Sequence, residues 1–287
     1  MANVNFSNIP PLTEKIFHRF KELIYSETGI TMRDSKRILV SNRLRKRINA
    51  LNLTSYDEYY NFLTRTNEGA KELPNFIDAI STNETYFYRG DNQFEVLKKF
   101  ILPELFQKKS KIRIWSAGCS SGEEPYSICI VILETAGTQW KGIVEIVATD
   151  INTEVIEKAK EGTYSGRTLK FVPKTLMTRY FEGVGNEKFR VREAVKEIIS
   201  FKCHNLLKDE PPGFGFNIIF CRNVMIYFNK STQKFIVDGS FNKALTHDGY
   251  LFIGHSESLS GVSEHFKYSR IHKAPIYVRI QKKQGRE

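Results

Sequence analysis

A strand, a turn of small residues and a helix follow one another over residues 111–133, and this stretch constrains the fold most. Its first five residues are predicted to form a short buried strand. Its last seven are almost continuously apolar, as expected for a helix packed on a sheet. The turn contains Gly118 and Gly122, and glycine lets a ligand approach the backbone because it has no Cβ. The helix start offers free N–H groups, and Pro125 suits a first helical turn.

A second buried strand is predicted over residues 143–149, and it ends in Asp150. In doubly wound α/β folds, a carboxylate at the end of the second strand binds ribose hydroxyl groups. The full G-x-G-x-x-G fingerprint is absent, and Asp150 lies 28 residues after Gly122, longer than the usual spacing in a dinucleotide site. The sequence therefore predicts a Rossmann-like nucleoside site that is not a typical NAD site.

Two further predicted strands, near residues 198–203 and 216–221, are followed closely by Asn205 and Asn223. Each asparagine alone is more typical of a turn. Because the carboxyl ends of the strands of an open parallel sheet line its ligand crevice, we expect both to lie near Asp150.

Composition narrows the class of protein. The 287 residues carry a net charge of +11, which suggests an acidic partner, although a basic soluble enzyme explains the charge equally well. The four cysteines form no C-x-x-C pair, so we expect a reduced cytoplasmic protein without a zinc site. We recognise no signal peptide and no apolar run long enough to span a membrane, so no membrane insertion is expected.

The pattern divides the chain into two predicted domains. Helical periodicity over residues 1–81 predicts a small all-helical domain, and residues 82–287 are predicted to form the α/β domain. Within it, residues 162–200 replace the α/β alternation with glycines and short β-like pieces, which predicts an inserted antiparallel β subdomain.

The predicted second helix, residues 34–49, is strongly basic. Lys36, Arg43 and Arg47 recur at spacings that place them in one stripe. The stripe has two interpretations, a solvated face or a docking surface for an acidic helical or polynucleotide partner.

The segment 81–90 is dense in aromatic and hydrogen-bonding side chains, including Asn83, Thr85 and Arg89. It shows little helical or strand periodicity. It is either an interdomain loop or a segment folded over a ligand pocket.

Six motifs, in order along the chain, resemble the CheR family of chemotaxis receptor methyltransferases, and the resemblance covers roughly residues 12–280. The motifs are Ser-Thr-Asn-Glu-Thr-Tyr-Phe-Tyr-Arg (81–89), Trp-Ser-Ala-Gly-Cys-Ser-Ser-Gly-Glu-Glu-Pro-Tyr-Ser (115–127), Ala-Thr-Asp-Ile-Asn (148–152), Asn-Leu-Leu (205–207), Phe-Cys-Arg-Asn-Val-Met-Ile-Tyr-Phe (220–228) and Gly-His-Ser-Glu-Ser (254–258).

The resemblance implies a protein-glutamate O-methyltransferase that uses S-adenosyl-L-methionine (AdoMet) and releases S-adenosyl-L-homocysteine (AdoHcy). It implies a class I, Rossmann-like methyltransferase domain behind a helical N-terminal domain. The implied substrates are glutamate side chains of chemotaxis receptors, methylated for sensory adaptation. The implied partner is the cytoplasmic helical domain of these receptors. We expect a monomer that binds no nucleic acid.

The resemblance also implies the site residues. Arg89 and Tyr227 would face the methyl group as the catalytic residues, and Glu124 is favoured over Glu123 as the cofactor glutamate. No metal ligand is implied. The implied cofactor-binding residues are Asn83, Thr85, Arg89, Glu124, Asp150, Asn205, Leu206, Asn223 and Val224.

An ionised glutamate is already a nucleophile, so methyl transfer to it requires no general base, and no Ser-His-Asp or Cys-His set is evident. Three rival functions stay open: a nucleic-acid methyltransferase, an AdoMet-binding sensor without catalysis, and an NAD-dependent oxidoreductase. The basic helix shows no interleaved aromatic platform, which disfavours the first rival. The sequence identifies neither the receptor nor its glutamates, nor whether the inserted subdomain binds a receptor tail.

Overall fold

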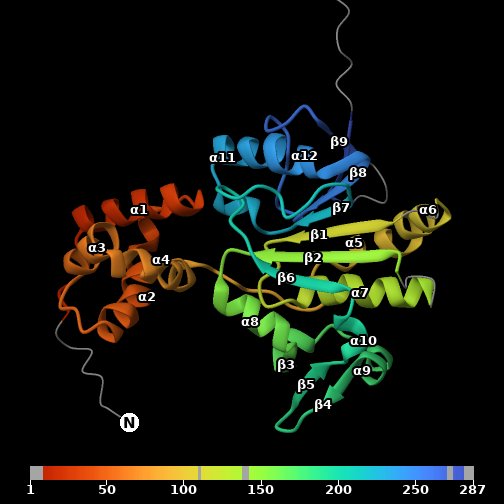
Figure 1. The fold of residues 1–287 in the computed structure, drawn as a ribbon, viewed down its shortest axis with the longest axis horizontal. Helices are drawn as coiled ribbons and strands as arrows, with labels where there is room; N and C mark the ends of the chain where they lie inside the picture. The colour runs from red at the N-terminus through yellow and green to blue at the C-terminus, as the bar shows by residue number, and fades with distance from the viewer. Residues whose placement is uncertain (1–8, 109–110, 138–141, 270–273, 281–287) are drawn as a thin grey trace, which may run out of the picture.

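The computed structural model describes residues 9–108, 111–137, 142–269 and 274–280. A small helical body is joined to a larger body built on a sheet (Figure 1). The helical body consists of α1 (Glu14–Thr28), α2 (Arg37–Ala50), α3 (Tyr56–Arg65) and α4 (Asn67–Ile80). These helices enclose a core of their own, with Phe17, Phe20, Tyr59 and Phe76 fully buried at its centre.

Local sequence signals explain where these helices begin and end. Thr13 caps α1 by accepting the N–H of Ile16, and Gly29 ends α1 in the left-handed conformation. The sequence Ser55-Tyr-Asp-Glu58 at the start of α3 forms a capping box only in part. Ser55 accepts the N–H of Glu58, but the Glu58 carboxylate turns to the N–H of Thr54.

The larger body contains a seven-stranded sheet in the order β6-β2-β1-β7-β8-β10-β9. Strands β6, β2, β1, β7 and β8 are parallel, whereas β10 runs antiparallel to both β8 and β9. Their bounds are β1 (Ile112–Ala117), β2 (Val144–Asp150), β6 (Ile199–Cys203), β7 (Phe216–Cys221), β8 (Leu245–Ile253), β9 (Phe266–Ser269) and β10 (Ile276–Arg279).

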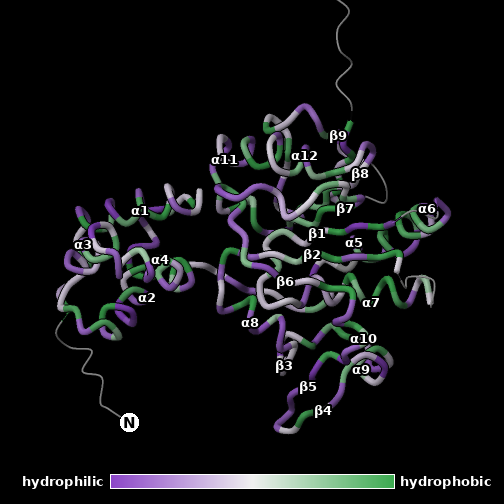
Figure 2. The backbone as a smooth tube through the Cα atoms, viewed as in Figure 1, coloured by the Kyte–Doolittle hydropathy of each residue, from purple (hydrophilic) through white to green (hydrophobic). Residues whose placement is uncertain are grey.

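Helices cover both faces of this sheet. Ile114 on β1 packs toward α5 (Asp91–Val96), α6 (Leu102–Gln107) and α7 (Glu123–Ala136). The next residue, Trp115, packs on the other face, against the π-helical stretch Phe235–Phe241 and α12 (Asn242–Ala244), which continue the helix α11 (Lys230–Lys234). The central strands are buried on both faces and are coloured largely as hydrophobic in Figure 2.

The predicted inserted subdomain is present as a second, antiparallel sheet in the order β3-β5-β4. It follows α8 (Thr153–Glu161) and comprises β3 (Thr163–Ser165), α9 (Lys174–Tyr180), β4 (Phe181–Gly183), β5 (Lys188–Val191) and α10 (Glu193–Lys196). The predicted fold class is thus confirmed. The two short helices α9 and α10 were not predicted.

Some elements are irregular. The helical run from α5 to α6 contains a π-helical stretch, Leu97–Ile101, and Phe100 within this stretch is exposed. Strand β8 begins at Leu245, directly after α12. Strand β9 was missed because four residues carry too little periodicity. Among the described residues, no helix is long and apolar enough to cross a membrane.

Candidate cofactor site

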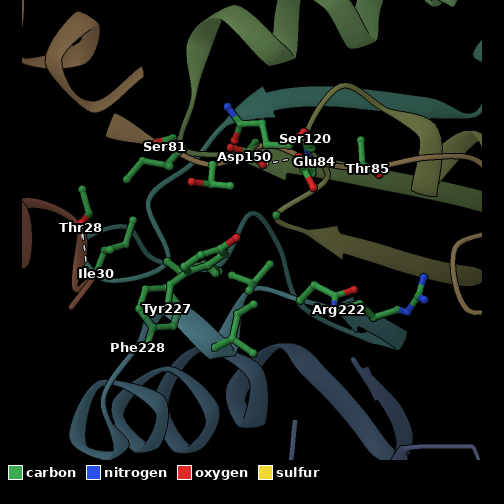
Figure 3. Close-up of a pocket in the computed structure, with 18 of the residues that line it drawn as sticks. Thr28, Ile30, Ser81, Glu84, Thr85, Ser120, Asp150, Arg222, Tyr227 and Phe228 are labelled. Carbon is green, nitrogen blue, oxygen red and sulfur yellow. Dashed lines mark hydrogen bonds between the residues drawn. The ribbon is translucent and has the colours of Figure 1, made fainter. Parts of the chain in front are cut away.

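A cavity of about 410 Å³ lies at the carboxyl ends of the parallel strands, within the size range of small-molecule sites. Three parts of the chain line it: the turns after the strands, the segment 81–89, and residues 28–39 of the helical body. Figure 3 shows Asp150 and Ser120 on one side of this cavity, and Tyr227 and Phe228 on the opposite side.

The two glycines of the first turn have different roles. Gly118 has φ +85°, and a Cβ on it would lie 2.4 Å from Cγ2 of Val224, so only glycine fits beside this cavity residue. A Cβ on Gly122 would lie 2.9 Å from Cβ of Ala159, so this glycine serves the packing of α8 instead. Of the two glycines, Gly118 lines the cavity and Gly122 does not.

Asp150 is buried at the end of β2. Its carboxylate accepts backbone N–H groups from Ser120 (2.8 Å) and Asn152 (3.0 Å). Burial raises the pKa of this carboxyl group. A carboxylate has about four acceptor positions, so it retains capacity for the hydroxyl groups of a ligand.

The two adjacent glutamates of α7 point to different places. Glu124 lines the cavity, where it accepts hydrogen bonds from Ser116 Oγ (2.7 Å) and from Nη1 of Arg222 (3.0 Å). Burial raises the pKa of Glu124, and the Arg222 guanidinium opposes this shift. Glu123 lies beneath the turn, where it accepts a hydrogen bond from Ser121 Oγ (2.7 Å). The geometry therefore favours Glu124 as the residue available to a ligand.

Segment 81–89 folds over the cavity rather than linking the two bodies as a plain loop. Arg89 donates to the carbonyl oxygen of Glu84 (2.8 Å), and its guanidinium carbon lies 5.8 Å from the Tyr86 ring centroid. Ser120 Oγ donates to the carbonyl oxygen of Asn83 (2.9 Å), which ties this segment to the first turn.

Tyr227 lies in a turn after β7, across the cavity from Asp150. Its carbonyl oxygen accepts the N–H of Thr31 (2.8 Å), so the helical body holds this turn directly. Burial raises the pKa of its phenol, which therefore stays a neutral hydrogen-bond donor at neutral pH.

The structure brings every predicted site residue to the lining of this one cavity. Asn205 lines the cavity, but its carboxamide already has partners within the protein. Its Nδ2 donates to the carbonyl oxygen of Glu27 (2.7 Å), and its Oδ1 accepts the N–H of Leu207 (2.9 Å). The lining residues that were predicted are Asn83, Thr85, Arg89, Glu124, Asp150, Asn205, Leu206, Asn223, Val224 and Tyr227.

Sequence reasoning missed the part of the lining that comes from the helical body. Thr31, Met32, Arg33, Lys36 and others from residues 28–39 contribute to the cavity. Arg33 and Lys36 belong to the basic run noted in the sequence, but nothing in their spacing indicates that they reach a site in the other body. Arg222 was also missed, although it lies within the motif 220–228.

The basic stripe does not form one free surface. Arg43 donates to the carbonyl oxygens of Ile80 (2.7 Å) and Ser81 (2.9 Å), and Arg47 forms a two-pronged ion pair with Glu72. Both arginines therefore hold α2 against α4. The exposed cations among residues 33–47 are Arg33, Lys36, Arg37 and Lys46.

Comparison with known proteins places the chain in a class. Residues 83–274 match the family described as "CheR methyltransferase, SAM binding domain", and residues 15–81 match "CheR methyltransferase, all-alpha domain". The chain belongs to the CheR methyltransferase family, and it is an AdoMet-dependent methyltransferase.

Named relatives are similar over most of their length. A chemotaxis protein methyltransferase of Borreliella burgdorferi is 39% identical over 259 residues, which cover 87% of this chain and 90% of that protein. One from Escherichia coli is 39% identical over 263 residues, covering 89% and 88%. Chemotaxis protein methyltransferase 2 of Vibrio cholerae is 36% identical over 275 residues, covering 94% and 95%.

The cavity fits the cofactor of this class. AdoMet combines ribose hydroxyl groups, an adenine ring and a charged amino-acid end, and the cavity offers buried carboxylates at Asp150 and Glu124. Gly118 and Val224 lie side by side in the lining of the same cavity.

Proposed function

We propose that this protein transfers the methyl group of AdoMet to glutamate side chains of chemotaxis receptors, forming glutamyl methyl esters for sensory adaptation. One observation carries the proposal: Asp150, Glu124, Arg89 and Tyr227, from four separate segments, line one cavity of a CheR-family chain.

The chain's own residues suggest how the cofactor would be held. Asp150 would accept the ribose hydroxyl groups, and Glu124 would bind the amino group of the methionine end. Thr85 lies in the segment that folds over the cavity. The remaining proposed contacts of the cofactor are Asn83, Arg89, Asn205, Leu206, Asn223 and Val224.

AdoMet supplies an electrophilic methyl group on a positively charged sulfur. The incoming glutamate needs only to be ionised, positioned and shielded from water. Arg89 would hold the carboxylate through charge-assisted hydrogen bonds, and the neutral Tyr227 phenol would border the reacting methyl group. Residues 28–39 would help to exclude water, since they form part of the cavity lining.

The cavity mouth suggests the kind of partner. Arg33 and Lys36 line the cavity and are exposed, next to the exposed apolar side chains of Leu39 and Ile226. An acidic amphipathic helix would satisfy both the cations and the apolar side chains. We therefore assign residues 1–81 the role of docking on the cytoplasmic helical domain of a receptor, and we propose that the enzyme works as a cytoplasmic monomer.

A competition experiment tests the acceptor. The protein would be incubated with methyl-labelled AdoMet together with a receptor cytoplasmic fragment, RNA and DNA. Label in the receptor fragment alone supports the proposal. Label in nucleic acid would support the rival methyltransferase, and AdoMet binding without any transfer, across several receptor fragments, would support a sensor.

A further inference from the structure

The motif at residues 254–258 has no role in the site described so far, yet one of its side chains reaches the site's backbone. Glu257 follows β8, and its carboxylate accepts three backbone N–H groups. Oε2 accepts from Asn223 (3.0 Å) and from Gly254, and Oε1 accepts from Ile226 (3.1 Å). Two of these donors belong to the turn that follows β7.

A second side chain binds the same turn, as a hydrogen-bond donor where Glu257 is an acceptor. Gln233 of α11 donates through Nε2 to the carbonyl oxygens of Met225 (2.9 Å) and Phe228 (3.1 Å). The turn 223–228 thus has N–H groups bound by a carboxylate and C=O groups bound by a carboxamide. Neither Glu257 nor Gln233 lines the cavity, so both act through the turn.

The turn needs such support because its backbone is unfavourable on its own. Asn223 has φ +58°, in the left-handed region that residues other than glycine rarely adopt. A different backbone conformation at Asn223 would move the neighbouring Val224, whose Cγ2 occupies the space that a Cβ on Gly118 would need. It would also move Tyr227, three residues further along the same turn.

Gly254 allows the loop that carries Glu257 to approach the turn 223–228 closely. A Cβ on Gly254 would lie 2.7 Å from Oε2 of Glu257 and 2.9 Å from the backbone nitrogen of Asn223. The bonds from Asn223 and Ile226 span 34 and 31 residues of sequence, so Glu257 does more than cap its own loop.

We propose that Glu257 and Gln233 are positioning residues for methyl transfer: together they fix the turn 223–228 and so place Val224 and Tyr227 at the cavity. The proposal rests on the function proposed above. What the proposal adds is a claim about the conformation of the turn 223–228, and this conformation can be measured without a receptor.

The test uses Glu257→Gln, a change of nearly equal size. The amide keeps one acceptor oxygen and turns an NH₂ group toward a backbone N–H, so at least one amide of the turn loses its partner. In hydrogen–deuterium exchange of the ligand-free protein, we expect peptides covering residues 222–228 to exchange about tenfold faster or more. Peptides from α7 should exchange as in the wild type.

Calorimetry and kinetics provide independent readouts. We expect AdoHcy to bind Glu257→Gln about tenfold to hundredfold more weakly. With a receptor fragment, kcat should fall by a larger factor than the KM for the fragment rises, because Arg33, Lys36 and Leu39 of the proposed docking surface lie outside this turn. Glu257→Asp, which keeps the charge, should recover part of the affinity. Glu210→Gln changes an exposed carboxylate and serves as the matched control.

Gln233→Glu is the second variant, and it tests the positioning role if Glu257→Gln does not fold. It places a carboxylate oxygen against the carbonyl oxygens of Met225 and Phe228, so the same peptides should exchange faster. Wild-type exchange and wild-type AdoHcy affinity in the folded variants would overturn the proposal. A wild-type protein that methylates no receptor would contradict the proposed function but leave the exchange result valid.

Discussion

At the scale of single residues, Arg89 is the side chain whose role the geometry limits most. One guanidinium nitrogen is bound to the Glu84 carbonyl oxygen, which fixes the side chain over the cavity with further N–H groups free to bind a carboxylate. Besides its proposed contact with the cofactor, Arg89 can therefore orient an incoming glutamate.

We expect Arg89→Ala to lower turnover more than cofactor affinity. The loss of a preorganised donor costs about 2–4 kcal/mol of transition-state stabilisation, or roughly 30- to 1,000-fold in kcat. Single-turnover methyl transfer and calorimetry with AdoHcy would measure the two effects separately. Equal losses in turnover and affinity would mean that Arg89 mainly holds the cofactor.

Asp150 leads to a prediction about pH. Burial raises its pKa, so on acidification it gains a proton and loses acceptor capacity at a higher pH than an exposed aspartate, whose pKa is about 3.9. We expect the affinity for AdoHcy to fall on acidification, beginning at a higher pH than protonation of an exposed aspartate would cause.

The variant Asp150→Asn isolates this group. At neutral pH it should bind AdoHcy about tenfold to hundredfold more weakly, because an acceptor for the ribose is lost and an NH₂ group faces backbone N–H donors. Its remaining affinity should depend less on pH. An unchanged acid limb in calorimetric titrations of this variant would assign the pH dependence to another group.

At the scale of elements, α2 is held to α4 by the ion pair between Arg47 and Glu72. Glu72 is buried and also accepts a hydrogen bond from the Tyr59 hydroxyl group. Burial acts to raise the pKa of Glu72, but hydrogen bonds from Arg47 and Asn75 outweigh it and leave the pKa lowered. The stabilisation is therefore present above the ordinary pKa of glutamate and is lost as the pH falls through the lowered value.

We expect Arg47→Glu to destabilise the helical body by about 3–5 kcal/mol, because it leaves a buried carboxylate facing another carboxylate. Thermal or urea unfolding would measure the change. This outcome makes Arg47 unsuitable for testing receptor docking, although the sequence placed it in the same stripe as Lys36. A fully stable Arg47→Glu variant would show that the pair contributes little.

Lys36 is the suitable residue for the docking test, since it is exposed and lines the cavity mouth. We expect Lys36→Glu to leave the unfolding midpoint unchanged. It should reduce kcat/KM for a receptor fragment several-fold at low salt, with the difference shrinking as salt screens the charges. Lys46→Glu, which reverses another exposed charge further along α2, is the comparison variant. No change in receptor methylation at low salt would remove Lys36 from the docking surface.

Elements with strong local signals could be predicted from the sequence. Thr13 and Gly29 bound α1, and the apolar runs ending at Trp115 and Asp150 became β1 and β2. The partners of Arg43 could not be predicted, because helical spacing gives the direction of a side chain but not the backbone carbonyls that another helix brings to it.

At the scale of the whole molecule, the helical body completes the cavity instead of standing apart from it. The N–H of Thr31 binds the carbonyl oxygen of Tyr227, and Asp78 of α4 accepts hydrogen bonds from Thr153 at the start of α8. Short motifs predicted every proposed site residue, both those that follow the strands and those in the segment 81–89. They did not predict residues 28–39 in the lining, because this depends on how two bodies meet.

The central claim is that the methyl group is transferred to a glutamate carboxylate, and the chemical stability of the product tests it most directly. A receptor cytoplasmic fragment would be labelled with methyl-labelled AdoMet and then treated with mild alkali. The account predicts labelled methanol released from the fragment, as expected for a carboxyl methyl ester. Label that survives alkali would contradict it, since the methyl group would then not be in a carboxyl ester.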